Sequence, residues 1–239
     1  METMWRSLKN YIGSSVGKKQ VMGFTGLILY SFLFAHLVGN LGLIAGSDRF
    51  NSYGNLLQST LREIIVPVEI LLLACLLTHI VLAIWVSLEN LAARPVRYST
   101  YKSAGRTKKL GRGANLSSRS MMYAGLGLML FITIHVLRFR FGLFAPHPTT
   151  FVNGIEMRDI YTVVMSSFAD PVFTVIYCIA FVVLATHLWH GVESSFQSAG
   201  FNHPQYFPFV QAFSKLYAVA IGVGFNALAI WAYLQGVHS

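Results

Sequence analysis

The chain has 239 residues, of which 54% are hydrophobic and 11% are charged, whereas an ordinary soluble domain carries about 25% charged residues. The formal net charge is +9, but the apolar residues gather in blocks of membrane-spanning length, which excludes a soluble globular domain. We interpret the chain as a single all-α membrane domain.

Five apolar blocks follow one another along the chain, each of about 20 residues or more. Within each block apolar residues cover all faces, as in a helix surrounded by lipid and protein rather than by water. A stub, 1–20, precedes the first block, and a linker, 93–119, separates the second block from the third. The predicted transmembrane helices are 21–44, 66–88, 121–144, 172–192 and 209–233.

The distribution of basic residues predicts the orientation of these helices. The stub is basic, and the linker contains eight Lys or Arg residues and no acidic residue. The other two long connections, 45–65 and 138–171, are close to neutral. Since basic residues mark the cytoplasmic side, the N-terminus is predicted to be cytoplasmic and the C-terminus outside. The position of the linker between two helices favours topology, anionic lipid or a docked partner as its explanation, rather than nucleic acid.

Each of the first four predicted helices contains a histidine followed by an aliphatic residue: His36, His79, His135 and His187. At a rise of about 1.5 Å per residue, His36 and His135 lie at one height near the outer face. His79 and His187 lie at another height near the inner face, and the two layers differ by roughly 10–15 Å. The four histidines are therefore predicted to form two pairs, each drawn from two helices.

Two such pairs are what two b-type haems require. A haem iron takes its axial ligands from opposite faces of a flat ring, so two imidazoles must come from different helices at one height. The pattern predicts two stacked haem b groups, with His36 and His135 as ligands of the outer haem and His79 and His187 as ligands of the inner haem. A single intramembrane histidine also fits a core residue or a proton relay, and a zinc site is disfavoured because the four do not converge.

Small residues are predicted to leave room for the inner ring. Thr25 and Ala124 each lie eleven residues before an outer-layer histidine. Since eleven residues is about three helical turns, both face the inner layer from helices that provide no ligand there. Glycines at 23, 26, 125 and 127 reduce side-chain bulk in the same region. Small residues also let membrane helices pack closely, which is the alternative interpretation.

Several short motifs occur in an order that resembles a known family. The chain reads SSVGKK before the first helix, FLFAHLVGN within it and FNSYGNLL after it. THIVLAIW, ENLAARPVRY, SSRSMM, ITIHV and HLWHGVESSFQ then follow, and GFNHP comes after the fourth helix. Together they resemble the cytochrome b subunit of succinate dehydrogenases and fumarate reductases, in its single-chain, five-helix, dihaem form. The family's four axial ligands match the four histidines above.

The resemblance implies a bacterial inner-membrane anchor of the respiratory chain and the tricarboxylic acid cycle. Partner subunits, a flavoprotein and an iron–sulfur protein, would dock on the cytoplasmic side, on the stub Met1–Lys19, the basic linker and the GFNHPQYFP turn. Electrons would pass between the iron–sulfur clusters and a membrane quinone, menaquinone or ubiquinone, through the two haems. No dicarboxylate chemistry is expected in this chain, and a higher oligomer of the complex is compatible with it.

Secondary site residues are candidates of lower specificity. Glu69 or Glu63 is a candidate for proton exchange with a quinol, because an acid at the outer end of a helix is costly unless it is used or paired. The alternative is an interfacial residue. Arg138 is a candidate partner of an outer-haem propionate, since a guanidinium pairs with a carboxylate through two hydrogen bonds. It also suits lipid phosphate.

The inner side has its own candidates. Arg119, Ser118 and Lys19 are predicted to meet the propionates of the inner haem. His190 lies three residues after His187 and turns away from it by about 60°, so we interpret it as a boundary residue that meets a propionate, water or the iron–sulfur partner rather than as an axial ligand.

Two other functions remain open from the sequence. One is a dihaem anchor of another quinone-linked dehydrogenase or of a hydrogenase, which also uses histidines on helices. The other is a haem-free, proton-coupled transporter, which predicts paired broken helices at mid-membrane that the sequence does not contain. Visible absorption spectra separate the haem proteins from the transporter.

Overall fold

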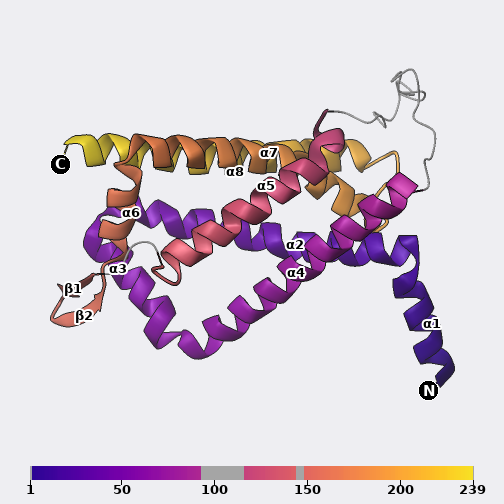
Figure 1. The fold of residues 1–239 in the computed structure, drawn as a ribbon, viewed down its shortest axis with the longest axis horizontal. Helices are drawn as coiled ribbons and strands as arrows, with labels where there is room; N and C mark the ends of the chain where they lie inside the picture. Colours follow the sequence, from indigo (N-terminus) through magenta and orange to yellow (C-terminus); the bar gives the residue numbers. More distant parts are fainter. Residues whose placement is uncertain (1, 93–115, 144–147, 239) are drawn as a thin grey trace. The chain divides into compact units, whose positions relative to one another are not determined.

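The computed structural model describes residues 2–92, 116–143 and 148–238 and is mostly helical. Figure 1 shows the elements in chain order. The first half comprises α1 (Glu2–Gly13), α2 (Ser15–Leu41), the 3₁₀ turn η1 (Gly42–Ala45), α3 (Ser47–Asn55), the π turn η2 (Leu56–Thr60) and α4 (Arg62–Ala92). The second half comprises α5 (Leu116–Phe139), β1 (Thr149–Val152), β2 (Ile155–Arg158), α6 (Ile160–Phe168), α7 (Pro171–Ser198) and α8 (Phe207–His238).

Within the described residues, five helices are long and apolar enough to cross a membrane, as the sequence predicted. They are Ser15–Ala45, Arg62–Ala92, Ser120–Phe139, Pro171–Ser198 and Phe207–Gly236. These bounds differ from the predicted ones mainly at the ends, where amphipathic or polar turns continue the helix past the apolar block. The predicted stub is itself helical, and most of the linker, 93–115, lies outside the described residues.

The third of these helices begins and ends earlier than predicted, and its last residue is Phe139 rather than a residue near 144. Gly142 adopts a φ of +65°, a conformation that glycine reaches without steric cost. The N–H of Gly142 donates to the carbonyl of Arg138 at 3.1 Å, and the N–H of Leu143 donates to that of Leu137 at 3.0 Å. These bonds satisfy carbonyls at the helix end and turn the chain away.

Polar residues start the helices. The Ser14 hydroxyl accepts a hydrogen bond from the Gly17 N–H at 3.1 Å at the start of α2. The Asp170 carboxylate accepts one from the Val172 N–H at 2.8 Å, directly before α7 and its first residue, Pro171. Such side chains satisfy N–H groups that have no partner within the helix, and proline is favoured at the first helical position because its missing N–H costs nothing there.

The chain divides into two compact units, and the long helices contribute to both. The first unit comprises Met1–Tyr30, Leu72–Gly125 and Thr186–Ala218, and the second comprises Ser31–Leu71, Leu126–Ala185 and Val219–Ser239. His79 and His187 therefore belong to the first unit, whereas His36 and His135 belong to the second. The division of the fold coincides with the predicted division of the four histidines into pairs.

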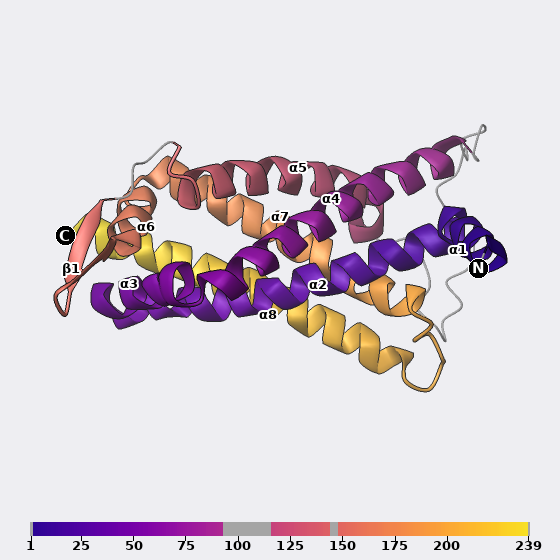
Figure 2. The same cartoon turned by 90° about the horizontal axis from the view of Figure 1, so that it is seen from below.

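The second unit contains a small layer that the sequence analysis did not predict. There α3 packs against η1, α6 and the antiparallel hairpin of β1 and β2, and Figures 1 and 2 show these elements together in both views. The hairpin turns at Asn153 and Gly154, whose φ angles are 52° and +78°, as in the tight turn that Asn-Gly favours. The layer lies in the two connections that the charge pattern assigned to the outside.

Candidate functional site

His36 and His135 come together in the second unit. The ring of His36 on α2 and the ring of His135 on α5 have centroids 6.0 Å apart and planes at 86°. Both rings lie among aromatic side chains: Phe225 is 5.8 Å from His36, and Phe139 is 5.2 Å from His135. The Tyr177 hydroxyl lies 3.3 Å from Nδ1 of His135. The predicted outer pair is thus a close pair from two helices in an apolar setting.

His79 is oriented by helix α2 within the first unit. Its Nδ1 lies 3.0 Å from the carbonyl oxygen of Met22, and since a carbonyl only accepts, this contact assigns the ring proton to Nδ1. Nε2 is then left with a free lone pair, the arrangement common for histidines that ligate a metal. The hydroxyl of Thr25, predicted to face the inner layer, lies 3.4 Å from the same Nδ1.

His187 is the predicted second member of the inner pair and, like His79, belongs to the first unit. Its Nδ1 is buried and has no hydrogen-bond partner among the described residues. Such an orphaned polar atom is costly unless the complete protein supplies a partner. His190, three residues further along α7, is partly buried, and its role as a boundary residue stays a prediction.

Glycines bring neighbouring helices against these two rings. A Cβ on Gly26 of α2 would lie 3.3 Å from Cε1 of His79, and a Cβ on Gly125 of α5 would lie 3.5 Å from Cε1 of His187. In contrast, a Cβ on Gly127 would meet no atom within 4 Å. Two of the four glycines that the sequence analysis singled out therefore lie directly beside the inner histidines, one on each helix that provides no inner ligand.

The donor chemistry of the four histidines suits haem iron, which takes two axial imidazoles. A metal–imidazole bond is about 2 Å long, so the ring centres of two imidazoles on one iron are roughly 6 Å apart, the separation found for His36 and His135. The inner pair offers the free Nε2 of His79 and the orphaned ring of His187. Among the described residues no group of three or more His, Cys, Asp and Glu side chains could hold a metal ion, whereas a haem iron needs only two protein ligands.

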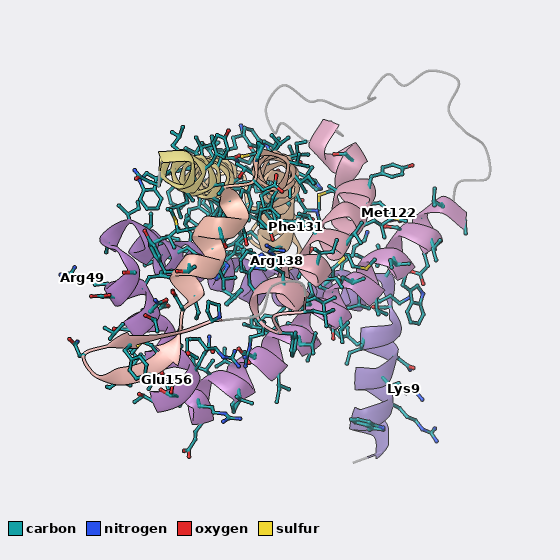
Figure 3. The ribbon with its side chains drawn as sticks, turned by 60° about the vertical axis from the view of Figure 1, so that its left-hand side comes forward. Lys9, Arg49, Met122, Phe131, Arg138 and Glu156 are labelled. Carbon is teal, nitrogen blue, oxygen red and sulfur yellow. The ribbon has the colours of Figure 1, made fainter. Side chains whose placement is uncertain are left out.

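The outer arginines have different partners. Arg138 donates from Nε and Nη2 to the Ser167 hydroxyl, at 3.1 and 2.8 Å, and stacks over the ring of Phe173 at 4.8 Å; Figure 3 labels it on α5. Arg140 instead forms a bidentate ion pair with Glu69, with both N···O distances 2.9 Å. Glu69 was a candidate from the sequence, but its ion pair with Arg140 could not be predicted there, because 71 residues separate the two partners.

The remaining candidates from the sequence differ in their exposure. Glu63 is exposed in the first turn of α4. Lys19 is exposed, whereas its neighbour Lys18 is 6% exposed, forms an ion pair with Glu89 and lies over the ring of Trp85 at 4.4 Å. The side chains of Ser118 and Arg119 lie outside the described residues. Of the two lysines in SSVGKK, only Lys19 is therefore available to a ligand.

Comparison of the chain with models of protein families, with curated proteins and with solved structures found no match.

Proposed function

We propose that the chain is the dihaem cytochrome b anchor of a succinate:quinone oxidoreductase in the bacterial cytoplasmic membrane. The observation that carries the proposal is the distribution of the four helix histidines over the two units, two in each, with every one on a different helix. The two in the second unit have ring centroids 6.0 Å apart. The motifs that resemble the family add the partner subunits. In this proposal the chain passes electrons between the iron–sulfur subunit and a quinone.

Haem b, when bound, supplies one-electron transfer. In the proposal, the chain holds each haem ring and excludes water from it. His36 and His135 would hold the outer haem, in the aromatic setting of Phe139 and Phe225. His79, whose Nδ1 is held by a backbone carbonyl, and His187 would hold the inner haem, and each of these two rings lies beside a glycine of a neighbouring helix.

Cationic side chains near each pair suit the haem propionates. Arg138 is the outer candidate, because its hydrogen bonds go to the neutral Ser167 hydroxyl and its charge is left for an acid. At the inner haem the candidates are Lys19, Ser118 and Arg119. A guanidinium–carboxylate contact is short and directional, so it would fix the ring's rotation as well as its position.

Quinol chemistry also requires a group that accepts protons. Glu69 or Glu63 serves this purpose in the proposal, and Arg140 holds the carboxylate of Glu69 by two hydrogen bonds. The side chain is fixed in one direction while it remains about 42% exposed, so it stays accessible from outside the protein. The quinone is menaquinone or ubiquinone.

The proposed topology places the N-terminus in the cytoplasm and the C-terminus outside. The basic stub and linker then face the flavoprotein and the iron–sulfur subunit. His190 lies one turn beyond His187 on α7, where it would meet a propionate, water or the iron–sulfur partner.

Visible absorption spectra of the purified full-length chain test the haem assignment. We expect two haem b groups per chain. The variants His36→Ala and His135→Ala should each lose the same haem, and His79→Ala and His187→Ala should each lose the other. A colourless wild-type protein, or loss of the inner haem in His190→Ala with retention in His187→Ala, would refute the assignment.

Two controls separate ligation from folding and from identity. His203→Ala removes a histidine that lies between α7 and α8 and whose Nδ1 accepts from the Gln205 N–H, so both haems should remain. Circular dichroism of each variant reports whether the helices still form. Co-purification with a flavoprotein that oxidises succinate then distinguishes this proposal from a dihaem anchor of another dehydrogenase or of a hydrogenase.

A further inference from the structure

A shallow groove lies along the last turns of the first membrane-spanning segment, within the second unit. Its cavity volume is about 530 Å³. The apolar part is lined by α2 and η1, through Phe34, Ala35, Val38, Gly39, Gly42 and Ala45. Four of these six residues are Gly or Ala, so the groove exists because one face of the segment lacks side-chain bulk.

Helix α3 closes the groove at its polar end with Arg49 and Tyr53. The Tyr53 ring lies directly on Gly39, where an added Cβ would come 2.8 Å from the phenol oxygen. Phe50, which is 7% exposed, anchors the same helix against Gly42, where a Cβ would lie 3.6 Å from its ring. Glycine at 39 on α2 and at 42 on η1 therefore lets α3 approach closely and places the phenol of Tyr53 against Gly39.

Arg49 carries a charge that the described residues do not neutralise. Figure 3 shows its side chain pointing away from the ribbon of α3, and no ion pair joins it to an acid in the described part of the chain. The adjacent acid, Asp48, accepts a hydrogen bond from the Ser47 hydroxyl at 3.3 Å. The groove thus ends in a free guanidinium and a phenol, which together can donate several hydrogen bonds to an anion.

The order of these features matches the order of groups in a membrane lipid. The apolar lining belongs to the span Ser15–Ala45, whereas Arg49 and Tyr53 lie just after it. Phe34 and Val38 are 57% and 51% exposed, so the groove opens on the surface rather than into a core. An acyl chain along the span would therefore place its headgroup phosphate at the level of the guanidinium.

We infer that this groove binds one anionic phospholipid, with an acyl chain along α2 and the phosphate on Arg49 and Tyr53. The charge of Arg49 favours this occupant over a neutral quinone, because a guanidinium pairs with phosphate through strong, charge-assisted hydrogen bonds. The site depends on the chain's spanning a membrane and is independent of haem, so it stands or falls separately from the proposed function.

Native mass spectrometry of the full-length chain, with phosphatidylglycerol or phosphatidylcholine of identical acyl chains, tests the site. We expect wild type to bind phosphatidylglycerol about tenfold more tightly, as one charge-assisted hydrogen bond implies. Arg49→Gln should abolish this preference and Arg49→Lys should retain it. The matched control is Arg62→Gln, which removes an exposed arginine at the start of α4, outside the groove, and should leave the preference intact.

Ala35→Leu fills the apolar part and should weaken both lipids equally. Equal binding of the two lipids by wild type would overturn the proposal, and so would an unchanged preference in Arg49→Gln. Displacement of the bound lipid by a neutral quinone that binds wild type and Arg49→Gln equally well would also overturn it, because the groove would then be a quinone site. Circular dichroism confirms that each variant is folded before its lipid binding is compared.

Discussion

Asp159 offers the sharpest quantitative test of the layer outside the membrane-spanning helices. Its carboxylate accepts from the Thr162 N–H at 3.0 Å and the Thr162 hydroxyl at 2.7 Å at the start of α6, and from the Asn51 amide of α3 at 2.9 Å. Asn51 is 1% exposed, and its carbonyl oxygen accepts from the Tyr161 N–H at 2.9 Å. One carboxylate therefore caps α6 and joins it to the helix that carries the lipid groove.

Asp159→Ala removes the helix cap, at a cost of about 0.5–2 kcal/mol, and leaves the buried Asn51 amide without an acceptor, at about 1–3 kcal/mol. Because these two effects overlap, we expect the free energy of local opening of α6 to fall by about 2–4 kcal/mol. Amide hydrogen exchange at Tyr161 and Thr162 should therefore accelerate roughly 30- to 1,000-fold.

Asp48→Ala is the matched control, since Asp48 lies on α3 in the same unit and contacts only the Ser47 hydroxyl among the hydrogen bonds described for its side chain. Its effect on exchange in α6 should be below threefold. Equal exchange rates in Asp159→Ala and wild type would show that the cap and the link to α3 do not stabilise this layer, and the reasoning would be wrong.

The same network predicts a response to pH. Burial raises the pKa of Asp159, but hydrogen bonds from Thr162 and Asn51 outweigh it and hold the pKa below its ordinary value. A carboxyl with a lowered pKa contributes stability that is complete above the ordinary value, near pH 4, and is lost as the pH falls through the folded value. Protection of α6 should therefore decline below about pH 4 in wild type, and Asp159→Asn should remove that decline.

Two further predictions concern the first unit. Lys18→Ala removes the cation from Trp85 and from Glu89, whose carboxylate then has no cation in the described structure, so the thermal unfolding midpoint of the purified chain should fall. Lys9→Ala, which changes an exposed side chain of α1, should leave the midpoint unchanged. Gly125→Leu places a side chain against His187 and should shift or abolish the absorption of one haem. The control Gly127→Leu places its side chain in open space and should leave both absorptions unchanged. Identical spectra of Gly125→Leu and wild type would contradict the proposed inner site.

The membrane helices and the histidine positions were predictable because their signals are local. A block of about 20 apolar residues becomes a transmembrane helix whatever surrounds it, since the bilayer leaves no other partner for the backbone. The turn at Asn153 and Gly154 and the cap at Asp159 also have local signals, in the Asn-Gly pair and in an Asp before an apolar run. The small layer was therefore within reach of sequence reasoning, which did not use these signals.

The side-chain pairings could not be predicted in the same way. Glu69 and Arg140, Lys18 and Glu89, and Asn51 and Asp159 are separated by 71, 71 and 108 residues. Each residue alone fits several roles, as an interfacial charge, a docking residue or a ligand of a cofactor. Only the packing of the helices determines which of the possible partners is near enough to form an ion pair or a hydrogen bond.

By itself the sequence determined five helices long and apolar enough to span a membrane, and it placed one histidine in each of the first four and small residues at 26 and 125. Helix rise and hydrophobic length are properties of a single segment, so they can be read without the tertiary structure. The tertiary structure decided which of these residues are in contact. It places the ring of His36 beside that of His135 and the Met22 carbonyl beside Nδ1 of His79. It also pairs Glu69 with Arg140 and packs α3 on Gly39. These contacts depend on how helices rotate and pack against one another, and that geometry is set by long-range complementarity that no single segment encodes.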